Sequence, residues 1–464
     1  MRGMAESLTT AGREQEATTA AGSSHFRWVI CGLLFWVTTA NYIDRGVFGN
    51  LAPELARKIP GWSQDAYWYM QVAFNAAYAI SLLLSGRLMD VIGLRRGFVL
   101  MCAFWGLASM SHSLVGTVAG FFVVRILLGL GEGGNFPAAI KTTAEWFPKR
   151  ERALATGIFN CGTNIGGVLV PFCLPWVVMR FTEVTFGGHC LGWRGAFLAT
   201  GILDAAWIIA WLLIYRRPEE HPRVSPGELA LINSDPPEPT VKIPWRRLFP
   251  HRQAWAFAAA KFMTDCFWWF YLVGAPYFFS DRFGLSLKSR SAPVAIIYVM
   301  ASLGSIGGGW LSGHFMKLGW GVNKARKMTF LVCALCVVPV VFATVTHDKW
   351  VAVALITLAA SAHQAWSANA FSLASDMFPR RVVGSVTGFG GFAGSIGAIA
   401  LFVVVGQLRK TAIARGEPGN YFLIFLAASL AYLVALLIIH LLAPKLEPAD
   451  VEDKATQANA QGAR

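Results

Sequence analysis

Apolar runs of roughly 20 residues, separated by shorter polar stretches, recur along nearly the whole chain. A helix of about 20 apolar residues is long enough to cross the ~30 Å hydrocarbon core of a bilayer. The runs predict twelve membrane-spanning helices, at residues 28–51, 66–89, 97–115, 117–140, 152–176, 193–215, 254–279, 292–316, 328–346, 350–375, 383–407 and 420–443. The expected fold class is therefore an all-α polytopic membrane protein embedded in a lipid bilayer.

The polar stretches divide these helices into two groups of six. The stretch at residues 217–253 is rich in proline and charged residues, which is typical of a linker. Within it we expect at most a short surface helix around Pro226 to Ile232. The predicted organisation is an N-terminal tail (1–26), a first six-helix bundle (27–216), the linker (217–253), a second bundle (254–443) and a C-terminal tail (444–464).

The two bundles carry matching motifs in matching positions. Glu145-Trp-Phe-Pro-Lys-Arg, followed by Thr156-Gly157, corresponds to Asp376-Met-Phe-Pro-Arg-Arg, followed by Thr387-Gly388. An even number of predicted spans separates the two motifs, so the bundles have the same orientation in the membrane. Two parallel six-helix halves with a central pathway between them are the plan of transporters that work by alternating access.

The charge of the chain supports a membrane protein rather than a nucleic-acid-binding one. Charged residues make up 14% of the chain, well below the ~25% that is typical of soluble domains. The formal net charge is +14, but the basic residues lie between the apolar runs rather than in one patch. The loops on the side of the N-terminus hold more Lys and Arg than the loops opposite, which predicts that both termini are cytoplasmic.

Two charged residues, Asp44 and Arg45, lie inside the first apolar run. A charge at that depth costs several kcal/mol unless it is paired or faces water, so such residues usually line a functional cavity. An ion pair that only locks two helices together is the alternative.

The fourth apolar run adds a second acid and base. Arg125 and Glu132 are seven residues apart and so share a helix face. Asp44 and Glu132 are the two acids most suited to carry a proton, unless Glu132 is permanently paired with Arg125. The sequence assigns no role to Asp204, the lone acid of the sixth run.

The loop between the second and third runs resembles the signature of the major facilitator superfamily. Its residues read Gly86-x-Leu88-x-Asp90-x-x-Gly93-x-Arg95-Arg96. The resemblance implies a short loop whose Gly86, Asp90, Arg95 and Arg96 form a breakable gate on the cytoplasmic side. A signal for membrane topology alone is the alternative.

Longer stretches resemble hexuronate transporters of the anion:cation symporter family. They include Asn-Tyr-Ile-Asp-Arg (41–45), Leu-Gly-Glu-Gly-Gly-Asn-Phe-Pro-Ala-Ala-Ile-Lys (130–141), Lys-Phe-Met-Thr-Asp-Cys-Phe-Trp-Trp-Phe-Tyr (261–271) and His-Gln-Ala-Trp-Ser-Ala-Asn (363–369). The resemblance implies proton-coupled uptake of glucuronate or galacturonate across a bacterial inner membrane. It also implies that Asp44 and Glu132 couple protons and that Arg45 and Arg125 serve the anion.

A sugar acid needs a cation for its carboxylate, amides and hydroxyls for its ring hydroxyls, and an aromatic face for its C–H surface. Arg presents a planar fork that suits a carboxylate, so Arg45 is the first choice for that contact and Lys261 the second. The candidate substrate-binding residues are Arg45, Tyr78, Arg125, Asn160, Thr163, Asn164, Lys261, Trp269, His363, Gln364, Trp366 and Asn369.

Some of these candidates also have simpler explanations. Lys261 and Asp265 are four residues apart on one helix and could neutralise each other. His363 and the neighbouring Trp268 and Trp269 could serve packing alone.

The sequence favours a transporter over an enzyme or sensor. We find no nucleophile–base set, metal-ligand cluster or soluble catalytic domain, and we expect no cofactor or metal. The Gly-x-x-x-x-Gly-Lys-Ser/Thr loop of ATP-driven proteins is also missing. The expectation is a monomeric symporter that brings hexuronates and protons into the cell by alternating access. The alternative is symport of another organic anion, such as galactonate or an aromatic carboxylate.

Overall fold

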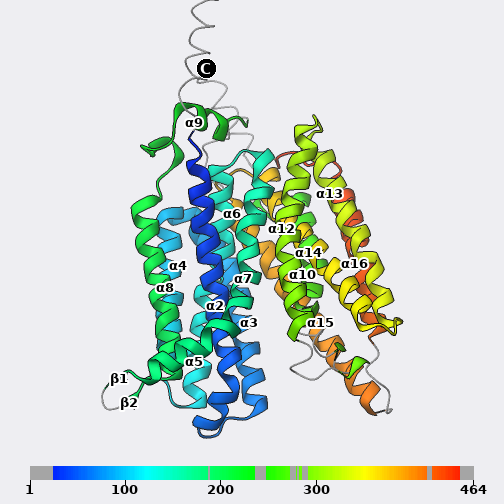
Figure 1. Ribbon diagram of the computed structural model, residues 1–464. Coiled ribbons are helices and arrows are strands. Elements are labelled where there is room, and N and C mark those ends of the chain that lie inside the picture. The colour runs from blue at the N-terminus through cyan, green and yellow to red at the C-terminus, as the bar shows by residue number, and fades with distance from the viewer. Residues whose placement is uncertain are drawn as a thin grey trace, which may run out of the picture.

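The structure is a computed structural model that describes residues 24–449, except 187–188, 236–246, 272–277, 280–281, 285–290 and 415–420. Long helices form two bundles that stand side by side (Figure 1). The first bundle holds α2 (Phe26–Lys58), α3 (Gln64–Ile92), α4 (Leu94–Ser111), α5 (Val118–Glu132), α6 (Asn135–Trp146), α7 (Lys149–Thr182) and α8 (Trp193–Ile214). The second holds α10 (Arg252–Trp269), α12 (Ser291–Lys317), α13 (Val322–Val337), α14 (Lys349–Met377), α15 (Val383–Ala414) and α16 (Phe422–Leu442).

Within the described residues, eleven segments are long and apolar enough to cross a membrane. This finding confirms the expected all-α polytopic class. The one predicted span that is not among these eleven, 254–279, corresponds to α10, and part of it, residues 272–277, lies outside the described residues. Short 3₁₀ segments at His112–Leu114, Pro218–Glu220 and Val338–Thr344 extend or follow the long helices.

Two smaller elements lie at opposite ends of the molecule. A helix, α9 (Pro226–Ile232), follows α8 at one end, where the short linker helix was predicted. An antiparallel hairpin of β1 (Thr185–Phe186) and β2 (His189–Cys190), which the sequence did not predict, joins α7 to α8 at the other end (Figure 1). We call these the α9 end and the β1–β2 end.

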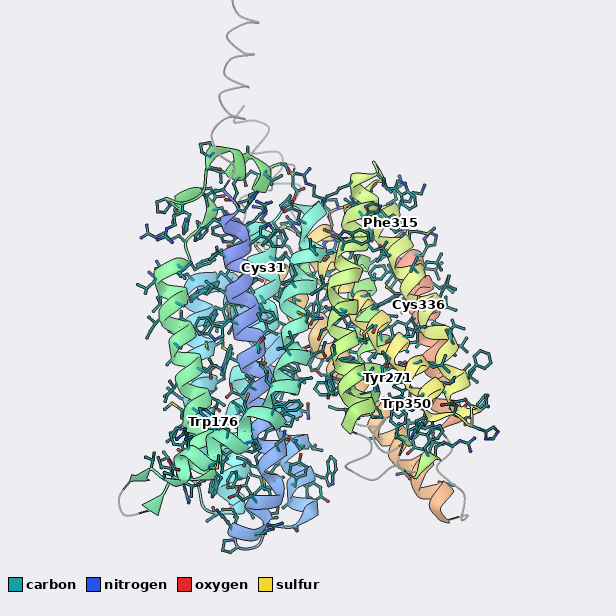
Figure 2. All side chains as sticks on the ribbon, viewed as in Figure 1. Cys31, Trp176, Tyr271, Phe315, Cys336 and Trp350 are labelled. Atoms are coloured by element: carbon teal, nitrogen blue, oxygen red, sulfur yellow. The ribbon has the colours of Figure 1, made fainter. Side chains whose placement is uncertain are left out.

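Apolar side chains face outward around both bundles (Figure 2). Trp176 and Trp350, labelled in Figure 2 toward the β1–β2 end, are 57% and 52% exposed. Tryptophan is enriched where a membrane-spanning helix meets the headgroups. The polar residues, in contrast, include many that are buried inside the bundles, which is the arrangement that a lipid environment requires.

Glycines bring the two bundles into backbone contact. A Cβ placed at Gly86, Gly157, Gly309 or Gly388 would lie 2.2–2.3 Å from a backbone oxygen of the opposite bundle. Only glycine allows helices to approach this closely. The contacts join α3 to α15 and α7 to α12, and those of α3 and α15 lie toward the α9 end.

Glycines also shape the place where the fourth predicted span breaks into α5 and α6. A Cβ at Gly129 would lie 2.5 Å from the Phe74 backbone oxygen, and one at Gly131 would lie 2.6 Å from the Trp105 Cβ. The last turn of α5 is therefore pressed between α3 and α4. Glu132, the final residue of α5, is fully buried there.

Candidate functional site

A cavity of about 70 Å³ lies between the two bundles. Helices α2, α3, α6 and α7 line it from the first bundle, and α10, α14 and α15 line it from the second. Seven of the residues predicted to bind substrate are on its wall: Tyr78, Asn160, Thr163, Lys261, Trp269, His363 and Gln364.

Amide groups bridge the bundles at this cavity. The Asn160 Nδ2 on α7 donates to the Gln364 Oε1 on α14 at 2.6 Å and approaches the Ser305 Oγ on α12 at 3.1 Å. Asn164, one turn further along α7, accepts a longer bond of 3.5 Å from the Gln364 Nε2. The same amides can therefore hydrogen-bond each other or the hydroxyl groups of a ligand.

The cation from the second bundle is Lys261. Its Nζ lies 2.7 Å from the Asp265 Oδ2 and 3.8 Å from the centre of the Phe371 ring. The alternative that these two residues neutralise each other is thus confirmed for this state. Both still line the cavity, so the pair faces any bound ligand.

The cation from the first bundle is Arg45 on α2. Its guanidinium lies 4.3 Å from the centre of the Tyr78 ring and 4.8 Å from that of Tyr42, and both rings line the cavity. Its Nε pairs with the Glu132 carboxylate at the end of α5. Arg45 is therefore just behind the cavity wall, held there by a buried acid.

Arg125 does not pair with Glu132 by a hydrogen bond in this structure. Its Nη2 donates to the Gln71 Oε1 at 2.5 Å, and its guanidinium lies over the Phe74 and Phe48 rings at 4.1 and 4.5 Å. The alternative of a permanent Arg125–Glu132 pair is wrong for this state, because Arg45 occupies the carboxylate. Arg125 is buried beside this group rather than on the cavity wall.

Asp44 points to another part of the first bundle. Its Oδ1 accepts a hydrogen bond of 2.7 Å from the Ser109 Oγ on α4. Adjacent residues of a helix point about 100° apart, so Arg45 reaches α3 and α5 while Asp44 reaches α4. The two predicted proton carriers, Asp44 and Glu132, therefore lie on different sides of α2.

Aromatic groups and His363 form the far wall. The Trp268 ring stacks on the His363 ring with centroids 5.2 Å apart and an interplanar angle of 9°. The His363 Nδ1 also lies 2.7 Å from the Tyr432 hydroxyl. His363 thus has a packing role in addition to its place on the cavity wall.

Two predicted substrate residues lie away from the cavity. Trp366 is fully buried in the second bundle against the Phe330 and Tyr432 rings. The Asn369 side chain bonds to Arg326 and to the Gly308 backbone oxygen. Both side chains hold helices of the second bundle together, and neither is on the cavity wall.

Other residues on the wall were not among those predicted to bind substrate. Thr387, Gly391 and Ser395 on α15 follow each other at intervals of four, and Tyr42 precedes Arg45 by three. Such spacing marks one helix face, and it was the available signal. It was weak because small residues of this kind are common throughout membrane helices.

The predicted gate residues separate into two groups. Gly86 and Asp90 lie at the contact between the bundles, where the Asp90 Oδ2 accepts bonds from the Ser385 backbone N–H at 2.8 Å and hydroxyl at 2.6 Å. The Asp90 Oδ1 pairs with the Lys141 Nζ at 2.6 Å. Asp90 thereby links α3 and α6 of the first bundle to the start of α15 in the second.

The other two gate residues make no hydrogen bond or ion pair between the bundles within the described part of the chain. The Arg95 Nη2 donates to the Leu212 backbone oxygen of its own bundle at 2.6 Å. Arg95 and Arg96 line a basic cleft of about 900 Å³ at the α9 end. At the rim of this cleft, burial and the nearby Glu145 carboxylate raise the pKa of the Tyr215 phenol well above its usual range.

Comparisons with known proteins agree with this arrangement. A family model described as the Major Facilitator Superfamily matches residues 34–402. The chain is 28% identical over 392 residues to the hexuronate transporter of Escherichia coli (strain K12), covering 83% of this chain and 88% of that protein. It is 29% identical over 319 residues to the galacturonate transporter of Dickeya chrysanthemi, covering 67% and 89%.

Two further proteins widen the comparison. A probable L-galactonate transporter of Escherichia coli (strain K12) is 27% identical over 370 residues, covering 78% of this chain and 79% of that protein. Among solved structures, the proton:xylose symporter XylE superposes with a TM-score of 0.71 at 15% identity, covering 94% of this chain and 100% of that chain. At that identity the likeness concerns the fold alone.

Proposed function

The chain belongs to the Major Facilitator Superfamily and is a transporter rather than an enzyme, and from that premise we propose that it carries hexuronates into the cell together with protons. The substrates would be glucuronate and galacturonate. The protein would lie in the inner membrane of a bacterium, with both termini in the cytoplasm. The protein would act as a monomer, because two halves around one cavity are sufficient for alternating access.

The chemistry of the cavity is the observation that carries this proposal. Its wall offers the cation of Lys261, the amides of Asn160 and Gln364, and the aromatic face of Trp269. Those are the groups that recognise a carboxylate, ring hydroxyls and a C–H surface. The similarity to a hexuronate and a galacturonate transporter supports the same class of substrate.

Both cations near the cavity already have an acidic partner, which suggests how protons and substrate are coupled. Arg45 is paired with Glu132, and Lys261 with Asp265. A proton added to Glu132 would remove the charge that holds Arg45, and its guanidinium could then turn to a substrate carboxylate. In this scheme the proton binds before the anion, and release of the proton restores the ion pair and expels the anion.

The cavity is smaller than the ~300 Å³ at which ligand pockets usually begin. A hexuronate therefore requires the two bundles to move apart at one end before it can bind. Closure at the α9 end by Asp90 and the glycine contacts means that the first opening would occur at the β1–β2 end.

The test is uptake of labelled glucuronate and galacturonate into proteoliposomes with an imposed inward proton gradient. Wild type would accumulate both acids. The variants Asp44→Asn and Glu132→Gln would lose accumulation but still exchange substrate across the membrane. The variant Arg45→Ala would lose both accumulation and exchange. The matched control is Glu54→Gln, which removes a carboxylate from a surface pair with Lys58 and should behave as wild type.

A second candidate is transport of a different sugar acid, which the similarity to a probable L-galactonate transporter favours. Competition by unlabelled galactonate, glucarate and aromatic carboxylates separates the two. If folded protein transports galactonate and neither hexuronate, the substrate assignment is wrong. Accumulation that follows a sodium gradient and ignores a proton gradient would show that the coupling ion is misassigned.

A further inference from the structure

A pair of buried carboxyl groups lies inside the first bundle, away from the cavity. Asp44 on α2 and Asp204 on α8 are each 1% exposed, and their side chains approach each other where the Ser109 and Thr200 hydroxyls also meet. Neither residue lines the cavity. The sequence assigned no role to Asp204, and the structure now gives it a neighbour, Asp44, with which it can act.

The surroundings of the pair leave most of its oxygens without a donor. The Ser109 Oγ serves the Asp44 Oδ1 and lies 2.9 Å from the Thr200 Oγ1. The Asp44 Oδ2 and both Asp204 carboxylate oxygens are buried and have no hydrogen-bond donor among the described residues. The Trp105 indole N–H approaches Asp204 from α4 but does not reach hydrogen-bonding geometry.

Packing excludes water from one side of the pair. A Cβ at Gly106 on α4 would lie 3.2 Å from the Asp204 Cβ and 3.3 Å from its Oδ2. The α4 backbone therefore covers this carboxylate directly.

The charged and titratable groups that face the pair do not neutralise it. Arg45 follows Asp44 in sequence, but its guanidinium is bound to Glu132. Glu132 on α5 and Cys102 on α4 are near enough to influence the pair, and neither brings a positive charge. No cation among the described residues makes a hydrogen bond to either aspartate.

Two carboxylates in contact and out of water cannot both be ionised without a large free-energy cost. A single proton held between them removes the repulsion and gives one of the unsatisfied oxygens a donor. Carboxyl pairs elsewhere in proteins share a proton for the same reason. The pair is thus built to bind one proton and to release it when the surrounding charges change.

We propose that Asp44 and Asp204 together bind one proton, and that Asp204 is the second half of the coupling site. The role in transport rests on the proposed function, whereas the proton binding does not. Loss of the shared proton adds a second negative charge to the pair, one residue from Arg45, where it competes with Glu132 for the guanidinium. The protonation state of the pair can in this way change the position of the Arg45 guanidinium behind the cavity wall.

The test measures the shared proton without any substrate. The protonated-carboxyl stretch is followed by infrared spectroscopy while the pH is raised, using purified protein in lipid nanodiscs. In Asp204→Asn the band of Asp44 should disappear at a pH lower by about one unit or more, a tenfold weaker affinity for the proton. Asn is close in shape to Asp, but it brings no like charge and can donate a hydrogen bond to the ionised Asp44.

The reciprocal variant gives an independent reading. In Asp44→Asn the band of Asp204 should shift in the same direction and by a similar amount, because the coupling between two groups is the same from either side. This reading stands even where Asp204→Asn does not fold. Ser109→Ala should shift the band the other way, to higher pH, because it removes a donor to the ionised form. Glu54→Gln is the control.

The proposal is overturned if the pH midpoints of both aspartate variants equal that of wild type. It is also overturned if added sodium chloride, compared with choline chloride, removes the band at constant pH, since the pair would then hold a metal cation. Because no substrate is present, a failure of hexuronate uptake would leave this result standing. An unchanged infrared band would, conversely, leave the substrate assignment standing.

Discussion

At the scale of single residues, the Gln364 amide connects the two bundles at the cavity. It accepts a hydrogen bond from Asn160 and lines the cavity wall. A bound sugar acid would replace that contact, so Gln364→Ala should raise KM for glucuronate about tenfold, the worth of one hydrogen bond of ~1.4 kcal/mol. Initial rates of uptake against substrate concentration measure the effect.

The matched control for this variant is Gln407→Ala, which removes an exposed amide from α15 and should leave KM unchanged. An unchanged KM in Gln364→Ala would mean that the amide only bridges the bundles and does not contact substrate.

The residues of α14 illustrate what the sequence could and could not predict about the site. His363, Gln364, Trp366 and Asn369 were all candidates, and only the first two line the cavity. Helix α14 is buried on nearly every side along its second half. Its apolar pattern therefore has no polar face to mark the side of the cavity, and neighbouring helices decide which residues reach it.

At the scale of elements, α9 is attached to the start of α2 by one carboxylate. The Glu228 side chain is 1% exposed and accepts bonds of 3.0 Å each from the backbone N–H groups of Phe26 and Arg27 and from the Arg27 Nη1. It also accepts a bond of 2.5 Å from the Ser24 hydroxyl. The linker helix is thereby tied to the N-terminus of the first membrane helix.

This attachment predicts a pH dependence. Burial alone would raise the pKa of Glu228, but the bonds from Ser24, Phe26 and Arg27 outweigh it and lower the pKa below the usual value of 4.5. A lowered pKa in the folded state stabilises the contact at all pH values above about 4.5, and this stability is lost as the pH falls through the lowered pKa. The protection of α9 against hydrogen exchange, relative to free amides at the same pH, should therefore be high at neutral pH and fall only in acid.

Glu228→Gln should detach α9 at neutral pH at a cost of about 2 kcal/mol, the scale of a charged hydrogen bond. The protection of α9 in this variant, relative to free amides at the same pH, should then no longer change as the pH falls. Glu219→Gln, which changes an exposed neighbour in the same segment, is the control. Fast exchange of α9 in wild type at pH 7 would contradict the contact.

The elements themselves were largely predictable, for a physical reason. A membrane helix must be apolar over about 20 residues, so the spans stand out, and proline at the first turn marked the start of α9. The β1–β2 hairpin was missed because each strand has two residues, too few for an alternating pattern. The break between α5 and α6 lies at a run of glycines that pack closely against α3 and α4; the glycines are visible in the sequence, but the helices against which they pack are not.

At the scale of the whole molecule, the structure is closed at the α9 end by contacts that a transport cycle must break. Asp90 of the first bundle sits at the beginning of α15 in the second bundle, where it accepts from the Ser385 backbone N–H. A carboxylate in that position is stabilised by the unpaired N–H groups and the dipole of the helix. A second contact between the bundles joins α7 to α14, where the Arg152 Nη1 donates to the Ser375 backbone oxygen at 2.6 Å.

These contacts predict the effect of weakening the closure. Asp90→Asn removes the negative charge that binds the start of α15 and pairs with Lys141, an interaction of ~1.5–3 kcal/mol. The population of molecules open at the α9 end should then rise about tenfold or more. A cysteine introduced by Ser367→Cys, at a cavity residue that is 6% exposed in the closed state, reports this opening in a background without native cysteines.

The accessibility of that cysteine decides between opening and general loosening of the fold. A membrane-impermeant thiol reagent applied from the α9 side should modify this cysteine faster in Asp90→Asn than in the parent protein. The same reagent applied from the β1–β2 side should modify it more slowly in Asp90→Asn than in the parent protein. Opening at one end closes the other when two rigid bundles rock about a central site, whereas loosening would raise both rates. Lys58→Gln, at a surface pair far from the contact, should change neither rate. Equal rates in Asp90→Asn and its parent would mean that the glycine contacts alone hold the α9 end shut.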